Sequence, residues 1–117
     1  MISKFSKEVK EKIEDLNDLN NSLGFPKLYI VGGAVRNHFL GLSLDQKKDI
    51  DFTVNDGVKS NLLGISFGHL NDYNMKLINS SNVKVFLKEA AFDFSSGKSI
   101  SDSIINKIKK EFFLDWR

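Results

Sequence analysis

The stretch that decides the fold runs from Leu28 to Val54 and reads LYIVGGAVRNHFLGLSLDQKKDIDFTV. It opens with a four-residue apolar run, LYIV, which is typical of one buried strand. A Gly-Gly pair follows, and the next segment, AVRNHFLG, predicts a short helix that Gly41 can end. The apolar face of this helix is expected to consist of Val35, Phe39 and Leu40. After a polar link, DIDFTV predicts a second strand, so the order is strand, turn, helix, strand.

The glycines between the first strand and the helix are Gly32 and Gly33. A turn without side chains brings bare backbone N–H groups to a helix N-terminus, where an anion such as a phosphate can approach closely. The alternative interpretation is a tight turn that only needs a positive φ, because Gly pairs are common in loops.

Two carboxylates, Asp49 and Asp51, lie two residues apart on the second strand. They therefore share one face, with Cα atoms ~6.5 Å apart, while the apolar residues Ile50, Phe52 and Val54 take the opposite face toward the core. Adjacent like charges repel unless a cation lies between them, and Mg²⁺ prefers hard oxygen ligands of this kind. The alternative is a solvated strand face near a loop.

A phosphate-binding turn followed by a carboxylate-bearing strand is the arrangement that phosphoryl transfer needs. The segments VGGAVRNHFLG and KKDIDFTV resemble the head domain of class II CCA-adding enzymes and bacterial poly(A) polymerases, in the polymerase β nucleotidyltransferase superfamily. The matching positions are Val31-Gly32-Gly33, Val35-Arg36, Leu40-Gly41 and Asp49-Ile50-Asp51. Asn37 departs from the pattern, because the family usually has Asp there.

The resemblance implies a reaction and a set of roles. The reaction is Mg²⁺-dependent transfer of a nucleoside monophosphate from an NTP, ATP or CTP, to a hydroxyl such as the 3′ end of RNA or tRNA, with release of pyrophosphate. Gly32 and Gly33 would cradle the triphosphate, and Arg36 would steady the loop or contact phosphate. Asp49 and Asp51 would be the catalytic residues that ligate the metal in a two-metal arrangement.

Further candidate residues lie later in the chain. Asp93 stands between two phenylalanines in the segment 89–94, which predicts a strand, and the superfamily places a third carboxylate in such a pattern. An exposed Asp on an edge strand is the alternative interpretation. The segment KKEFFLD, with Lys109 and Lys110, resembles an altered form of the family's Arg-Arg-Asp-Phe-Thr-Ile-Asn motif, which belongs to the nucleotide site.

The rest of the pattern predicts an α/β fold of the α+β type, a nucleotidyltransferase fold with a mixed sheet of four or five strands flanked by helices. Apolar spacing predicts a first helix over 3–23 with Ser3 as its N-cap, and a helix over 58–70. The inward face of the latter is expected to hold Val58, Leu62, Ile65 and Leu70. Residues 75–78 and 83–87 predict a hairpin, and 99–116 a final helix.

Composition and length bound the possibilities. The 117 residues predict one head-like domain, 1–117, with its core in 28–94. A net charge of +2 neither requires nor excludes a nucleic-acid partner. The chain has no cysteine, no apolar run long enough for a membrane and no secretory leader pattern, so we expect a cytoplasmic protein without a membrane partner.

The family's neck, body and tail domains are not expected in a chain of this length. Three alternatives follow: a compact stand-alone nucleotidyltransferase, one half of a split enzyme completed by a second polypeptide, or a non-catalytic module that binds a nucleotide or a partner. The intact Asp-x-Asp pair favours an enzyme, because two idle adjacent carboxylates would cost stability.

Overall fold

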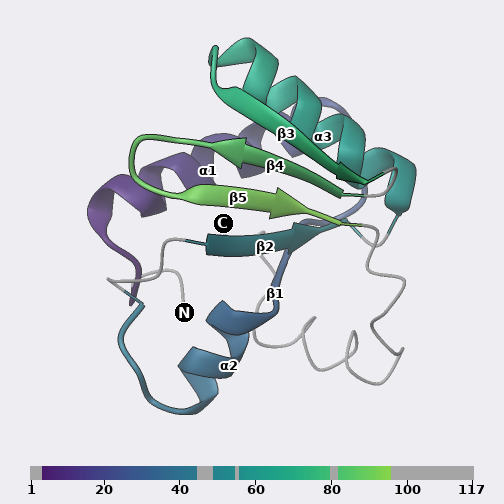
Figure 1. Cartoon of the computed structure of the whole chain (residues 1–117). Helices are drawn as coiled ribbons and strands as arrows, with labels where there is room; N and C mark the ends of the chain where they lie inside the picture. The colour runs from purple at the N-terminus through teal and green to yellow at the C-terminus, as the bar shows by residue number, and fades with distance from the viewer. Residues whose placement is uncertain (1–3, 45–48, 55, 80–81, 96–117) are drawn as a thin grey trace.

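Five strands form one mixed sheet in the order β1-β2-β5-β4-β3 (Figure 1). A computed structural model of the chain describes residues 4–44, 49–54, 56–79 and 82–95. The predicted helix over 99–116, with Lys109 and Lys110, lies outside the described residues. β2 and β5 pair in parallel, and the other neighbours are antiparallel. The strands are Tyr29–Val31 (β1), Asp49–Thr53 (β2), Asn74–Asn79 (β3), Asn82–Phe86 (β4) and Ala91–Phe94 (β5).

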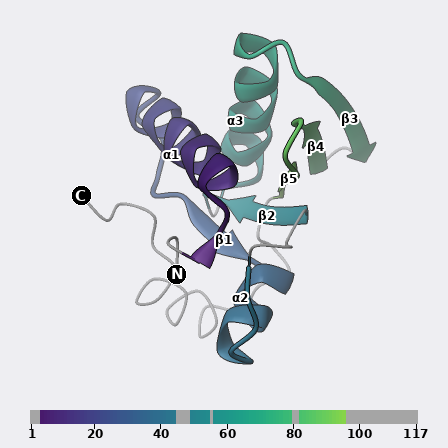
Figure 2. The ribbon, with the colours of Figure 1, turned by 90° about the vertical axis from the view of Figure 1, so that its left-hand side faces the viewer.

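Two helices, α1 (Lys7–Ser22) and α3 (Gly57–Leu70), cover one face of the sheet (Figure 2). The short helix α2 (Gly33–Phe39) contacts β1 and β2, the two strands at one end of the sheet. The predicted mixed sheet flanked by helices is therefore confirmed. The predicted start of the first helix at Ser3 is wrong, because Ser6 is the N-cap and its hydroxyl accepts a hydrogen bond from the Val9 amide at 3.4 Å.

The core lies between the sheet and these two helices. Alternate residues of the three central strands are fully buried there, which confirms the predicted inward face of Ile50 and Phe52. The rings of Phe52 and Phe92 lie 4.8 Å apart, and Phe67 from α3 stacks on Phe92 at 5.9 Å. Because side chains alternate along a strand, the carboxylates of β2 and β5 must point to the opposite face of the sheet.

The predicted inward face of α3 is wrong. All four residues assigned to it are exposed, and Val58 retains 70% of its surface. Two glycines instead face the sheet: a Cβ at Gly64 would lie 2.7 Å from the Phe94 ring, and one at Gly68 would lie 2.5 Å from the Met75 sulfur. Glycine lets the helix axis come close to the strands. The buried face of α3 consists of Ser60, Leu63, Gly64, Phe67 and Gly68.

The predicted apolar face of α2 is only partly buried. Val35 packs against the core, whereas Phe39 and Leu40 are 64% and 65% exposed. The helix has seven residues, and Ala34 is its fully buried side chain. The end of α2 therefore contributes little to the core.

A buried serine connects β2 to α3. The Ser60 hydroxyl accepts a hydrogen bond from the Val54 amide at 3.1 Å, and the Asp56 carboxylate caps α3 by accepting one from the Lys59 amide at 3.0 Å. These contacts fix the end of the carboxylate-bearing strand to the helix behind it. No helix within the described residues combines the length and the apolar character that crossing a bilayer demands.

The glycine contacts generate a prediction about stability. Gly64→Ala places a methyl group against the Phe94 ring, and overpacking of a core costs about 1–3 kcal/mol. Alanine recovers up to about 1 kcal/mol through its higher helix propensity. We expect the free energy of unfolding, measured by urea denaturation, to fall by about 1–2 kcal/mol.

The matched control is His69→Ala, an exposed position in the same helix, which should change the free energy of unfolding by less than about 0.5 kcal/mol. Equal stability of the Gly64→Ala variant and the wild type would contradict the close contact between α3 and β5.

Candidate functional site

Four charged residues form a row across the sheet face that α1 and α3 leave free. In the strand register, Asp51 on β2 lies opposite Asp93 on β5, Asp93 lies opposite Lys84 on β4, and Lys84 lies opposite Lys76 on β3. The strand order β2-β5-β4-β3 therefore converts residues that are far apart in the sequence into direct neighbours. Two acidic positions are followed by two basic ones.

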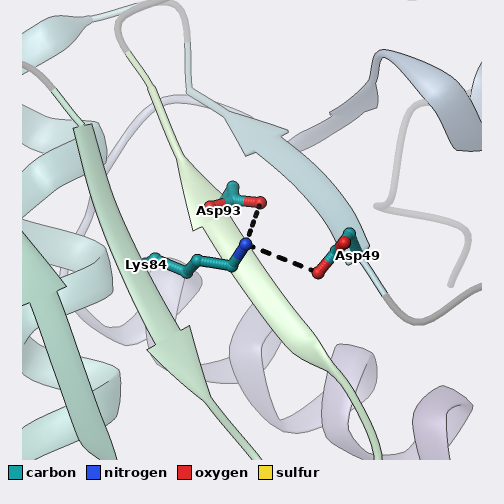
Figure 3. A network of polar contacts seen from close by, with 3 residues as sticks. All are labelled: Asp49, Lys84 and Asp93. Atoms are coloured by element: carbon teal, nitrogen blue, oxygen red, sulfur yellow. Dashed lines mark ion pairs between the residues drawn. The ribbon is translucent and has the colours of Figure 1, made fainter. Parts of the chain in front are cut away.

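Lys84 bridges two of the carboxylates (Figure 3). Its ammonium lies 3.5 Å from Asp49 Oδ1 and 3.9 Å from Asp93 Oδ2. The Asp93 and Lys84 side chains are about three-quarters buried, with 28% and 25% of their surface exposed, whereas Asp49 is 64% exposed. Lys84 thus supplies a positive charge beside two of the carboxylates. Ligation of Mg²⁺ by Asp49 and Asp51 stays a prediction.

Lys84 is the site residue that the sequence analysis missed. The signal for it was the alternation Val83-Lys84-Val85, which places a lysine on the face opposite two buried valines. The signal was incomplete, because only the pairing of β4 with β5 puts this lysine beside Asp93.

The environment of Asp93 favours its protonated form. Partial burial raises the pKa of this carboxyl from 3.8 to about 6. The nearby Lys84 ammonium lowers the pKa, while the charges of Asp51 and Asp49 and a side-chain hydrogen bond with Asp51 raise it. Burial and like charges outweigh the lysine, so Asp93 titrates close to neutrality.

Gly32 brings the backbone against the Asp51 side chain. Its φ is +74°, and a Cβ at this position would collide with the Asp51 carboxylate oxygen Oδ2. Both the positive φ and the close approach require glycine. Gly33 is the first residue of α2, and Arg36 lies exposed on the same helix. A phosphate-binding role of these three residues stays a prediction.

The residue types at this site suit a divalent metal better than their present arrangement does. Carboxylate oxygens are the ligands that Mg²⁺ prefers. Within the described ranges, however, no group of three or more acidic, histidine or cysteine side chains is arranged so that it could hold a metal ion. Asp49 and Asp93 instead contact an ammonium group.

The structure thus brings together five of the residues discussed so far: Gly32, Asp49, Asp51, Lys84 and Asp93. Gly33 and Arg36 lie on the adjoining helix α2, and Lys109 and Lys110 are outside the described residues. The arrangement offers carboxylates of two kinds on one face: an exposed Asp49, and a largely buried Asp93 whose pKa is raised.

Comparisons with known proteins bear on the fold. No family model matches the chain, and no curated protein matches its sequence. Among solved structures, the chain is similar to a tRNA nucleotidyltransferase complexed with a primer tRNA and an incoming ATP analogue, with 21% sequence identity and a TM-score of 0.56. This match covers 68% of the present chain and 22% of that chain.

A structure of a tRNA-processing enzyme complex is similar to the same degree, with 21% identity and a TM-score of 0.55, over 68% of this chain and 20% of that one. The chain therefore spans about a fifth of the length of these structural neighbours. At this identity the likeness establishes the fold, and the sheet with its flanking helices is nucleotidyltransferase-like.

The contact between Gly32 and Asp51 predicts an unequal response to two glycine replacements. Gly32 and Gly41 have nearly the same φ, +74° and +73°, but a Cβ at Gly41 would meet nothing within 4 Å. Gly41→Ala should therefore lose only the about 1–2 kcal/mol of the left-handed backbone, whereas Gly32→Ala should lose more, because it also displaces Asp51. Equal losses in urea denaturation would contradict the close approach.

The raised pKa of Asp93 predicts how stability depends on pH. The folded protein holds the Asp93 proton up to a pKa of about 6, while the unfolded chain releases it near 3.8. The contribution of Asp93 to the stability of the wild type should therefore fall as the pH rises through this window and stay constant above it. Asp93→Asn, which mimics the protonated form, should be more stable than the wild type at pH 7 and lose this advantage near pH 4.

The measurement is urea denaturation of both proteins in metal-chelating buffer across that pH range. A stability difference that stays constant over the whole range would show that Asp93 does not titrate in this way.

Proposed function

We propose that this chain carries the carboxylate centre of a nucleotidyltransferase. In the proposed reaction, the 3′ hydroxyl of an RNA such as tRNA attacks the α-phosphorus of ATP or CTP, the nucleoside monophosphate is transferred to that hydroxyl, and pyrophosphate leaves. Mg²⁺ is the proposed cofactor.

The observation that carries this proposal is the in-register parallel pairing of Asp51 with Asp93, with Gly32 seated against Asp51. This pairing sets two carboxylates side by side, and the backbone against one of them has no side chain. Phosphoryl transfer needs these components together, because catalysis consists mainly of positioning and of charge stabilisation.

In the proposed mechanism, Asp49 and Asp51 would hold Mg²⁺ from one strand. When bound, the metal would supply positive charge that offsets the charge of the phosphates. Asp93 serves either as a third ligand or as the base that accepts the proton of the attacking hydroxyl. Its pKa of about 6 suits the second role, since a general base works best when its pKa is near the working pH.

The remaining residues in the proposal bind the nucleotide. The backbone at Gly32 and Gly33 accommodates the triphosphate, because neither residue has a side chain to block its approach. Arg36, exposed on α2, contacts phosphate or steadies the turn. Lys109 and Lys110 are proposed to bind phosphate or ribose. The structural neighbour complexed with a primer tRNA and an ATP analogue supports the choice of an NTP and an RNA as partners.

One observation favours a second candidate function. Lys84 already forms ion pairs with two of the carboxylates, so the acidic cluster that argued for an enzyme has a structural counter-ion. A module that binds a nucleotide or a partner without turnover, alone or completed by a second polypeptide, is the alternative proposal.

Label transfer tests the proposal. The pure protein is incubated with Mg²⁺, each α-labelled NTP in turn and bulk tRNA, and label is followed into RNA. We expect incorporation that falls more than about 100-fold in Asp51→Asn, because even outer-shell partners of metal sites are worth about 10- to 100-fold in activity.

The matched control is Asp15→Asn, the same chemical change at an exposed position of α1, which should keep the wild-type rate. Incorporation that survives in Asp51→Asn would refute the metal assignment. A folded wild-type protein that binds NTP and transfers no label would favour the binding module.

A further inference from the structure

We infer that the Lys84 ammonium is the resident counter-ion of Asp49 and Asp93, and that a divalent cation ligates these two carboxylates together only by displacing it. The inference rests on the proposed function, because it concerns how the same carboxylates acquire their metal. It assigns Lys84 a role that the sequence pattern did not indicate.

The contacts of the Lys84 ammonium show which carboxylate oxygens a metal ion would compete for. The ammonium reaches carboxylate oxygens on two different strands, Asp49 on β2 and Asp93 on β5, at 3.5 and 3.9 Å (Figure 3). An ion that ligates both carboxylates competes for the same oxygens. Because a lysine ammonium and a divalent cation repel each other, the two cannot share them.

The position of Lys84 in the sheet carries the second step. β4 is an inner strand that pairs with β5 on one side and β3 on the other, so its backbone is held in place. The ammonium also lies 5.9 Å from the centroid of the Phe86 ring on the same strand. Release of the carboxylates therefore comes from side-chain rotation, and the Lys84 side chain, which is partly exposed, can turn toward solvent.

The charge balance carries the third step. Without a metal, the ion pairs of Lys84 offset part of the repulsion between Asp49 and Asp93. A divalent cation brings twice the charge and accepts more oxygen ligands than an ammonium, but each binding event must first break the ion pairs of Lys84. Metal affinity is therefore lower than the carboxylates alone would provide.

Mn²⁺ titration tests this inference. The signal of free Mn²⁺ in electron paramagnetic resonance is measured against wild type, Lys84→Met and Lys76→Met at one ionic strength. Both variants lose one positive charge from neighbouring positions in the same row, but only Lys84 is ion-paired to Asp49 and Asp93. We expect Lys84→Met to bind Mn²⁺ about fivefold or more tightly, and Lys76→Met to stay within about twofold of wild type.

The outcomes separate this inference from the proposed function. Equal affinity of wild type and Lys84→Met overturns the displacement while leaving a metal site in place. A gain of the same size in Lys76→Met also overturns it, because net charge alone would then explain the effect. If neither the wild type nor Lys84→Met binds Mn²⁺, the inference is overturned and the metal is removed from the proposed function. The transfer activity itself is tested independently by the label assay.

A second measurement needs no variant and covers the case in which Lys84→Met fails to fold. The wild-type protein is treated with an amine-acylating reagent with and without Mg²⁺ at constant ionic strength, and modification of each lysine is quantified by mass spectrometry. Displacement predicts that Mg²⁺ increases the modification of Lys84 and leaves that of Lys76 unchanged. Unchanged or reduced modification of Lys84 would overturn the inference.

Discussion

The parallel pairing of β2 with β5 is the interaction on which the rest of the structure depends. It aligns Ile50 with Phe92 and Phe52 with Phe94 on the helix-covered face, and by the same register it aligns Asp51 with Asp93 on the other. A shift of one residue would exchange the two faces, placing carboxylates in the core and phenylalanines in solvent. The apolar packing behind the sheet thus enforces the position of the acidic residues in front of it.

Sequence reasoning reached the parts of this arrangement that are local. Alternation along Asp49–Thr53 was enough to place two carboxylates on one face, and the Gly-Gly pair was enough to mark a turn. The inner face of α3 was not predicted correctly, because side-chain hydrophobicity does not indicate how closely a glycine-bearing helix can approach a sheet. Lys84 was not predicted as a site residue, because its position beside Asp93 depends on the strand order, which is a property of the whole sheet.

The fold and the charges of the site are supported by different kinds of observation. The likeness to tRNA nucleotidyltransferase structures concerns the path of the backbone over 68% of the chain, at 21% identity. The ion pairs of Lys84 and the raised pKa of Asp93 are properties of this chain's own side chains. The shared fold alone therefore does not determine the chemistry, which depends on the side chains that this chain places on the fold.

The close contact between Gly64 and the Phe94 ring limits which substitutions this protein can tolerate. Phe94 follows Asp93 directly, and the two side chains leave opposite faces of one strand. A larger residue at position 64 would press on the strand that carries the acidic group, so variation behind the sheet is transmitted to the electrostatics in front of it. The residues at positions 64 and 94 are then expected to co-vary in size among close relatives. A bulkier residue at position 64 would need a smaller side chain at position 94 if the carboxylate of Asp93 is to stay undisturbed.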